Sequence, residues 1–428
     1  MGARLHKILI AGSVGNILEW YDFALYGYFA PVLASLFFPS DHAVVSLLST
    51  FGVFAVGFLA RPLGAILFGH VGDTLGRKTA LVWSVMLMAV PTCLLGLLPT
   101  HEEIGFAAPL LLTLLRLLQG LSVGGEFAGS MAFLVEHAPV GRRGYAGSWS
   151  EFSAQVGILL GSGTSGLLTA TLSQEALYAW GWRVPFVLGV LVALVAVYMR
   201  TGIEESPEFE RLTKVGAVPR FPLRDVMLRR RTELAQAVGI ILLYATSFYL
   251  AFVYLITYLS RVLDYPLGPA MVSNTIGLAA FTILVPVMGA WSDRVGRRAP
   301  LLAGAAGLSL LAYPLFTLLG RQTLASILTA QLIFAVLVAC YAGPMCATVV
   351  ELFPPQGRYT GVSIAYNLAL ALFGGTAPLV ATFLIERSGS VLAPGWYLLA
   401  CAVVSGATVL YAVPPFWRRE MVETPVSE

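Results

Sequence analysis

Charged side chains are scarce in this sequence of 428 residues: only 11% are Asp, Glu, Lys or Arg, whereas 57% are hydrophobic. A soluble domain carries about 25% charged residues, so soluble enzymes and disordered scaffolds are poor candidates. The formal net charge is only +3. Over this length, that charge gives no reason to expect a nucleic-acid partner.

Cysteine and histidine are also few, with four and five copies. Cys93, Cys340, Cys346 and Cys401 lie in apolar runs and form no CxxC pair. We therefore expect buried thiols rather than a disulfide framework or a metal site. The histidines show no ligand spacing. These shortages predict a protein that is not an enzyme and holds no metal.

Long apolar runs fill the chain instead, separated by short clusters of charge. About 20 helical residues cross the ~30 Å hydrocarbon core of a bilayer, and an open strand there would leave its backbone unpaired. The sequence therefore predicts an all-α polytopic membrane protein with twelve transmembrane helices. The predicted spans are 8–38, 43–70, 79–99, 106–137, 145–172, 183–200, 233–262, 268–291, 299–319, 324–352, 361–387 and 394–413.

Most of the 26 basic residues fall on one side of these spans, if the N-terminus is cytoplasmic. The stretch 200–232, with Arg200 counted in it, is the richest in cations. Arg183, Arg261, Arg321 and Arg387 lie in the loops of the opposite side. Because cytoplasmic loops carry the excess of Lys and Arg, both termini are predicted to be cytoplasmic.

The chain also repeats itself. Residues 69–78 (GHVGDTLGRK) match residues 289–298 (GAWSDRVGRR), with Gly, Asp, Gly, Arg and a second cation in register. A parallel repeat of this kind is typical of secondary transporters. The predicted domains are an N-terminal six-helix bundle (1–200), a cytoplasmic linker (201–232), a C-terminal six-helix bundle (233–414) and a short cytoplasmic tail (415–428).

These loops and the segment 116–120 (RLLQG) resemble the major facilitator superfamily. Residues 15–23 (GNILEWYDF), 119–126 (QGLSVGGE) and 180–186 (WGWRVPF) resemble its metabolite:proton symporter family, which includes permeases for proline or betaine, 2-oxoglutarate, citrate and shikimate. The resemblance implies alternating access, with a proton as coupling ion and no other cofactor. It also implies a latch at the cytoplasmic gate, built by Asp73, Gly76, Arg77, Lys78, Glu136, Arg142, Asp293, Arg297 and Arg298.

Ionisable groups inside a membrane are costly and therefore functional candidates. Helical spacing places Glu19 and Asp22 on one side of the first span, and Arg116 and Glu126 on one face of the fourth. We hypothesise that Asp22, or Glu19, forms an ion pair with Arg116 that opens when the acid is protonated. Glu126 is a third candidate for the protonation site. The alternative is a permanent pair that only fixes helix packing.

The predicted substrate contacts share a polar or aromatic character and a position inside a span: Asn16, Tyr26, Arg116, Gln119, Gln155, Tyr244 and Tyr341. Tyr254 and Tyr258 lie near a predicted helix end and are expected to belong to the interfacial aromatic belt instead.

One deep cation, Arg116, favours a monocarboxylate or a zwitterion such as proline or betaine. A di- or tricarboxylate such as 2-oxoglutarate or citrate is the alternative substrate. From other classes, a channel is disfavoured by the two-half repeat, and a drug efflux antiporter by Ser162, which follows Gly161 where exporters carry Gly-Pro. We expect the protein to be a monomer in the bacterial inner membrane. Its expected partners are the small-molecule solute, protons and the lipid bilayer.

Overall fold

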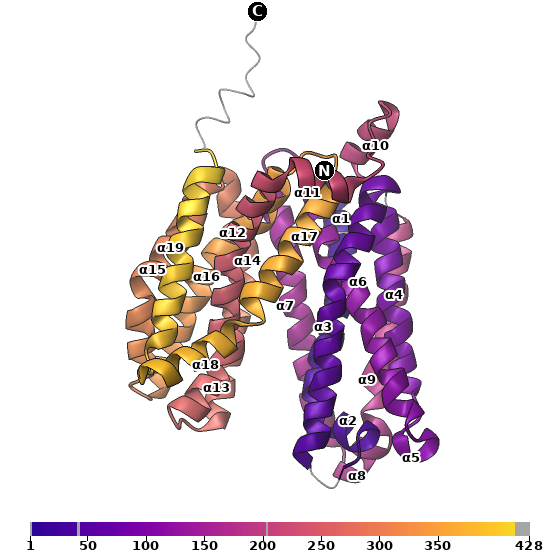
Figure 1. Cartoon of the computed structure of the whole chain (residues 1–428), viewed down its shortest axis with the longest axis vertical. Helices are drawn as coiled ribbons and strands as arrows, with labels where there is room; N and C mark the ends of the chain where they lie inside the picture. Colours follow the sequence, from indigo (N-terminus) through magenta and orange to yellow (C-terminus); the bar gives the residue numbers. More distant parts are fainter. Residues whose placement is uncertain (1, 41–42, 203, 416–428) are drawn as a thin grey trace, which may run out of the picture. The chain divides into compact units, whose positions relative to one another are not determined.

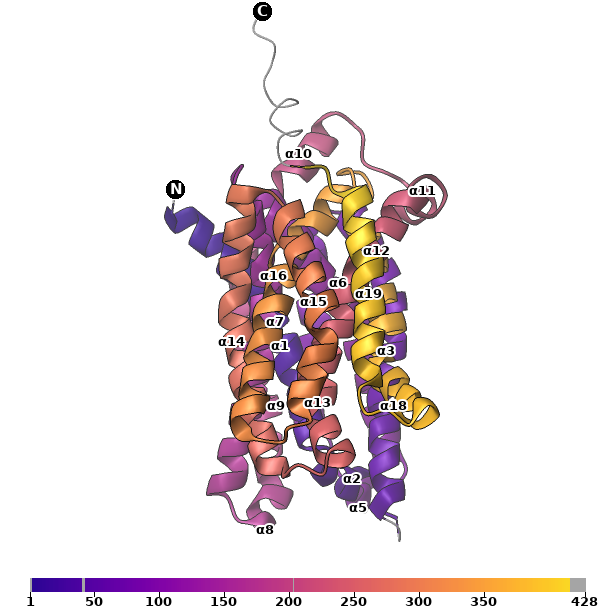
Figure 2. The ribbon, with the colours of Figure 1, turned by 90° about the vertical axis from the view of Figure 1, so that its left-hand side faces the viewer.

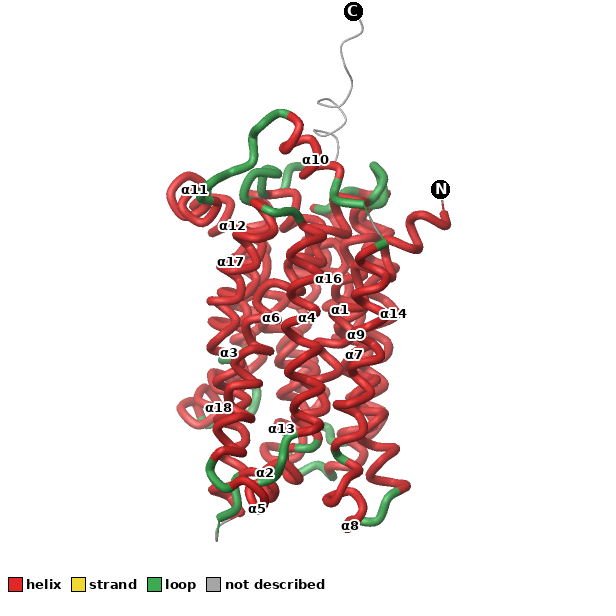
Figure 3. The backbone as a smooth tube through the Cα atoms, turned by 90° about the vertical axis from the view of Figure 1, so that its right-hand side faces the viewer, coloured by secondary structure: helices red, strands yellow, loops and turns green. Residues whose placement is uncertain are grey.

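The computed structural model describes residues 2–40, 43–202 and 204–415, and all regular structure in these ranges is helical (Figure 3). From residue 416 onwards, the predicted tail lies outside the described residues. The first half of the chain forms α1 (Gly2–Tyr28), α2 (Ala30–Phe37), α3 (Ala43–Thr74), α4 (Arg77–Leu97), α5 (His101–Ile104), α6 (Ala107–His137), α7 (Arg143–Thr171), α8 (Gln174–Ala176), the π-helix η1 (Leu177–Gly181), α9 (Arg183–Thr201), α10 (Pro207–Lys214) and α11 (Pro222–Arg229).

The second half continues with α-helices and three π-helical segments. In chain order, these elements are α12 (Arg231–Phe248), η2 (Tyr249–Tyr254), α13 (Leu255–Thr257), η3 (Tyr258–Val262), α14 (Leu267–Val295), α15 (Arg298–Leu319), α16 (Leu324–Leu352), α17 (Arg358–Ala369), η4 (Leu370–Gly374), α18 (Ala377–Ser388) and α19 (Ala393–Ala412). Two of the π-helical segments, η2 and η3, flank α13, and the third, η4, follows α17.

Each of the twelve predicted spans coincides with a helix or a run of joined helices. Within the described residues, nine helical runs are long and apolar enough to cross a membrane. They are α4, α6, α9, 231–262, α14, α15, α16, 358–388 and α19. The all-α membrane fold is therefore confirmed, whereas the count of twelve spans stays a prediction.

The chain divides into two compact units. Unit 1 holds residues 1–137, 153–226 and 354–364, and unit 2 holds 138–152, 227–353 and 365–428. The first turns of α7 thus belong to unit 2, and the first turns of α17 belong to unit 1. The predicted division at the 201–232 linker stays a prediction.

Glycines allow the helices of unit 1 to approach closely. The long helices α3 and α6 pack along one another, as do α4 and α9 (Figure 1). A Cβ on Gly120 would lie 2.0 Å from the Gly57 carbonyl oxygen, and one on Gly124 would lie 2.1 Å from that of Arg61. Such small-xxx-small stripes replace the hydrophobic driving force that helices lack in lipid.

The same device brings α7 against α1. A Cβ on Gly157 would lie 2.6 Å from the Ile17 carbonyl oxygen, and one on Gly161 would lie 2.7 Å from the Ala24 Cβ. The two glycines, four residues apart, therefore lie on the face of α7 that contacts α1. This contact holds the acid-bearing helix α1 next to α7.

In unit 2, α14 packs along α16, and α15 packs on both α16 and α19 (Figure 2). The prediction that Tyr254 and Tyr258 form an interfacial belt is wrong, because both are buried. Tyr258 donates to the Val391 carbonyl over 3.0 Å. Tyr254 lies at the end of η2, where Thr382 donates to its hydroxyl oxygen over 3.2 Å.

Candidate functional site

Asp22 of α1 and Arg116 of α6 form a buried ion pair in unit 1. Arg116 Nη1 lies 2.6 Å from Asp22 Oδ2, and the side chains are 2% and 0% exposed. The other oxygen of Asp22 accepts from Gln119 Nε2 over 3.0 Å and from the Thr92 hydroxyl over 3.1 Å. Two helices, α4 and α6, thus supply the donors that a buried carboxylate needs to stay charged.

Two aromatic rings line the guanidinium of Arg116. Its central carbon lies 3.7 Å from the ring centroid of Tyr26 and 5.7 Å from that of Phe23. The Tyr26 hydroxyl donates to the Thr50 carbonyl, so the ring is fixed from the far side. Stacking on an aromatic face stabilises a desolvated cation by roughly 0.5–2 kcal/mol. Asp22, Tyr26, Arg116 and Gln119 therefore form one cluster, as the sequence predicted they could.

Glu126 does not belong to that cluster. Its carboxylate pairs with Arg200 of α9, whose Nη1 lies 3.1 Å from Oε2, and it accepts from the Ser84 hydroxyl as well. Arg200 is only 2% exposed, although the sequence analysis counted it among the cytoplasmic loop cations. That assignment is wrong, because α9 runs on to Thr201 and keeps Arg200 inside the helix bundle.

Arg200 also joins several helices. Its Nε donates to the Ala11 carbonyl of α1 over 3.1 Å, and its Nη1 donates to the Leu81 carbonyl of α4 over 2.5 Å. With Glu126 on α6, one guanidinium therefore connects α1, α4, α6 and α9. The sequence could have indicated this position, because Arg200 is the last residue of the apolar run 183–200.

Glu19 is buried at 1% exposure one turn before Asp22. Among the residues that the structure describes, neither of its carboxylate oxygens has a hydrogen-bond partner. A charged carboxylate without such partners costs far more than the neutral acid. Glu19 and Asp22 thus differ in their hydrogen bonding, although they lie on the same side of α1.

Two further predicted substrate contacts also lie in unit 1. Asn16 is fully buried and donates to the hydroxyls of Ser130 and Ser153 over 3.0 and 3.2 Å. Gln155 of α7 is 2% exposed. Its side-chain oxygen has no hydrogen-bond partner within the described ranges.

The other two tyrosines that were predicted as substrate contacts, Tyr244 and Tyr341, lie in unit 2. Tyr244 of α12 donates its hydroxyl to Oε2 of Glu151, a fully buried acid on α7. Tyr341 of α16 donates to the Ile240 carbonyl over 2.9 Å and therefore ties α16 to α12. The sequence pattern did not point to the contact of Tyr244 with Glu151, because the two residues are 93 positions apart.

The first motif copy forms a cluster in unit 1. Asp73 accepts from the backbone N–H groups of Tyr359 and Thr360, at the start of α17, over 3.2 and 2.9 Å. Arg77 lies 3.3 Å from Asp73 and 3.2 Å from Glu136. A carboxylate at a helix N-terminus satisfies unpaired N–H groups and the helix dipole.

Several residues complete this cluster. Arg358 lies 3.0 Å from Glu136, and Lys78 Nζ donates to the Thr201 carbonyl over 2.9 Å. Gly76 has φ +108°, a backbone conformation that residues with a Cβ rarely adopt. All the gate residues predicted for this copy except Arg142 therefore lie in or beside it.

The second copy repeats the arrangement in unit 2. Asp293 accepts from the N–H groups of Gly144 and Tyr145, at the start of α7, over 2.8 Å each. Arg297 lies 2.7 Å from Asp293 and 3.4 Å from Glu351.

Two predicted gate cations stand apart from both clusters. Arg142 is exposed and Arg298 is half-buried, and neither side chain makes an ion pair in the part of the chain that is described.

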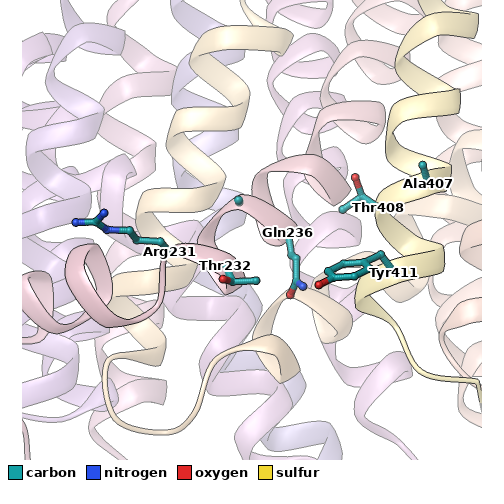
Figure 4. Close-up of a pocket in the computed structure, with 7 residues that line it drawn as sticks. Arg231, Thr232, Gln236, Ala407, Thr408 and Tyr411 are labelled. Carbon is teal, nitrogen blue, oxygen red and sulfur yellow. The ribbon is translucent and has the colours of Figure 1, made fainter.

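A surface groove of about 590 Å³ opens between the ends of α12 and α19. Figure 4 shows Gln236 and Tyr411 turned toward one another there, with Arg231 pointing away. Arg231, Thr232, Gln236, Ala407, Thr408 and Tyr411 line it with Ala235. None of these residues belongs to the Asp22 cluster or to the two motif clusters.

Comparison with known proteins identifies the class of this fold and site. The sequence model of the sugar (and other) transporter family matches residues 8–215 and 224–426. Solved structures agree at the level of the fold. The proton:xylose symporter XylE of Escherichia coli superposes with a TM-score of 0.77 at 18% identity, over 97% of this chain and 96% of that one. The E. coli fucose:proton symporter FucP gives 0.69 at 16% identity, over 95% and 100%.

Relatives that are similar in sequence are named for a narrower class of solutes. The glycine betaine/proline/ectoine/pipecolic acid transporter OusA of Dickeya dadantii is 34% identical over 95% of this chain and 83% of its own length. The proline/betaine transporter of E. coli K12 is 33% identical over 94% and 82%, and a putative proline/betaine transporter of Staphylococcus aureus is 34% identical over 95% and 88%. The chain belongs to the major facilitator superfamily, in the sugar (and other) transporter family. It is a multi-pass membrane transporter for a small solute and not an enzyme.

Proposed function

We propose that this transporter imports a proline- or betaine-like zwitterion together with protons, by alternating access. The observation that carries the proposal is the buried contact of Asp22 with Arg116, in a chain whose relatives are named as proline and betaine transporters. The positive-inside pattern supports a place in the bacterial inner membrane with both termini in the cytoplasm. A monomer contains all the elements that the proposal uses.

Protonation of an acid next to Arg116 is the proposed coupling step. Asp22 is held as a charged partner by three donors, whereas Glu19, one helical turn away, has none within the described residues. Residues three apart on a helix are neighbours, at roughly 5–6 Å. In the proposed cycle, Glu19 holds a proton while the pair is closed and passes it to Asp22 when the pair opens. Glu19 is then reprotonated by water that reaches the open site, so that it does not remain charged.

Opening the pair exposes Arg116 to the carboxylate of the solute. The guanidinium then exchanges one carboxylate for another, so its charge stays compensated in low dielectric. Glu126 takes no part in this exchange, because Arg200 already compensates its charge. One proton moving down ~150 mV releases about 3.5 kcal/mol. That energy supports roughly 300-fold accumulation of a neutral solute.

A zwitterion suits this site better than a di- or tricarboxylate. Arg116 is the cation of the Asp22 cluster, and each further carboxylate would enter low dielectric without a partner there. Citrate and 2-oxoglutarate are therefore the alternative substrates to exclude. A channel or an efflux antiporter has no observation in its favour.

Purified protein in liposomes tests this proposal. We expect an inward pH gradient to drive accumulation of labelled proline or glycine betaine, and a protonophore to abolish it. Citrate, 2-oxoglutarate and shikimate serve as the comparison solutes. Gradient-driven uptake of citrate or 2-oxoglutarate, with none of proline or betaine, would replace the zwitterion by the alternative class.

A further inference from the structure

Unit 2 receives its buried acid from the first turns of α7. Glu151 lies in the segment 138–152, which belongs to unit 2, and it is fully buried. Its side chain is 0% exposed, whereas that of Asp293, an acid of the second motif copy in the same unit, is 6% exposed. An acid kept inside a membrane protein marks a functional position by default.

Glu151 also lies deep in the predicted membrane. At 1.5 Å per residue, it is roughly 12 Å from the start of α7, and Tyr244 is roughly 20 Å from the start of α12. Half of a ~30 Å hydrocarbon core is about 15 Å. The contact between these two side chains therefore falls near the midplane, where solutes bind in transporters of this architecture.

Two aromatic side chains of α12 lie on the side of the acid that Tyr244 occupies. The Tyr244 hydroxyl donates to Glu151, and its ring lies 5.8 Å from that of Phe248. The Glu151 carboxylate of α7 thus contacts α12 directly, and the paired rings of Tyr244 and Phe248 lie beside that contact.

We propose that Glu151 and Tyr244 form the subsite for the positively charged nitrogen of the transported zwitterion. The Tyr244 hydroxyl fixes one carboxylate oxygen, and the ring offers a face that attracts a quaternary or secondary ammonium group. The same carboxylate repels a second negative charge on the solute. This subsite rests on the proposed function, because it requires the transported solute to be a zwitterion with a positively charged nitrogen.

Two ligands of the same shape test whether the subsite recognises the positive charge on the nitrogen. Glycine betaine and 3,3-dimethylbutanoate share a carboxylate and three methyl groups, but only betaine carries a positive nitrogen. We expect the wild type to bind betaine far more tightly than the carbon analogue, measured as KM for labelled betaine and Ki for the analogue. In Glu151→Gln, we expect KM for betaine to rise at least about 30-fold, with Ki for the analogue unchanged or lower.

Two further variants separate recognition from folding. Tyr244→Phe keeps the ring and loses the hydroxyl, so a smaller rise in KM for betaine alone is expected. Glu102→Gln in α5 is the matched control, because Glu102 is exposed and undergoes the same chemical change. At saturating betaine, Glu151→Gln should still accumulate it under a pH gradient.

Three results would overturn the subsite. Equal weakening of both ligands in Glu151→Gln would indicate a structural role, and an unchanged preference would place the nitrogen elsewhere. Lost accumulation at saturating betaine would instead make Glu151 a proton carrier. A wild type that transports citrate and binds neither isostere refutes the proposed substrate class itself, which is a distinct outcome.

Discussion

Arg200 Nη1 lies 3.1 Å from Glu126 Oε2, and the same guanidinium donates to two backbone carbonyls on α1 and α4. The pair is thus part of a network that joins four helices. The partners of the Asp22 carboxylate are the side chains of Arg116, Gln119 and Thr92, and no backbone N–H group of the described residues donates to it. We therefore propose an architectural role for the Glu126–Arg200 pair and a coupling role for the Asp22–Arg116 pair.

Removing Arg200 should destabilise the protein. Arg200→Gln leaves the Glu126 carboxylate buried without its cation, which costs about 3–5 kcal/mol. We expect a clearly lower thermal unfolding midpoint in detergent and a low yield of folded protein. The double variant Glu126→Gln/Arg200→Gln should recover part of the loss, because no uncompensated charge remains. A double variant as unstable as the single one would show that the backbone contacts, and not the charges, carry the effect.

Neutralising Asp22 should separate exchange from accumulation. Asp22→Asn keeps an acceptor for Gln119 but cannot release or bind the coupling proton. We expect pH-gradient-driven accumulation to disappear, with counterflow of substrate retained within about tenfold. Both are measured in the same liposome preparation. Accumulation at the wild-type level would refute the assignment of Asp22 to the coupling step.

Neutralising Glu19 should change the thermal stability of the protein less than neutralising Asp22 does. Because the described residues supply no donor to its carboxylate, Glu19→Gln replaces a neutral acid by a neutral amide. We expect its unfolding midpoint at pH 7 to stay within about 2 °C of the wild type. Its gradient-driven accumulation should be lost. Asp22→Asn, which strands Arg116, should unfold at a lower temperature in the same assay. A large loss of stability in Glu19→Gln would indicate that Glu19 is charged.

Local sequence patterns predicted the helices and the contents of the Asp22 cluster. Apolar run length places the spans within a few residues, because backbone polar groups in lipid require helices. Helical spacing put Asp22 and Arg116 on faces able to meet, and the structure brings them to 2.6 Å. Spacing within one helix could not decide which acid meets which cation, so Glu126 was grouped with Arg116 instead of Arg200.

Contacts between distant segments escaped the sequence for a different reason. Arg200 was read as a loop cation, because a charge at the end of an apolar run is compatible with either side of a helix boundary. The contact of Tyr244 with Glu151 depends on the first turns of α7 joining unit 2, which no periodicity encodes. The repeat predicted the two motif clusters. Arg142 and Arg298, which were predicted for the gate, lie outside these clusters, and Arg358 and Glu351 take part instead.

The two motif aspartates should contribute to transport through the helix starts that they hold. Asp73→Asn can still accept one N–H from the start of α17 but loses the charge that compensates Arg77, whose other carboxylate is Glu136. We expect the initial uptake rate to fall at least about tenfold, with a smaller effect on equilibrium solute binding, because the network acts on reorientation and not on the solute. Asp293→Asn makes the same change in the second copy, and Asp264→Asn, in a loop with positive φ, is a control outside both clusters. Rates are measured as the first seconds of labelled uptake, and binding by calorimetry on purified protein. A parallel loss of binding in Asp73→Asn would mean that the cluster shapes the solute site itself.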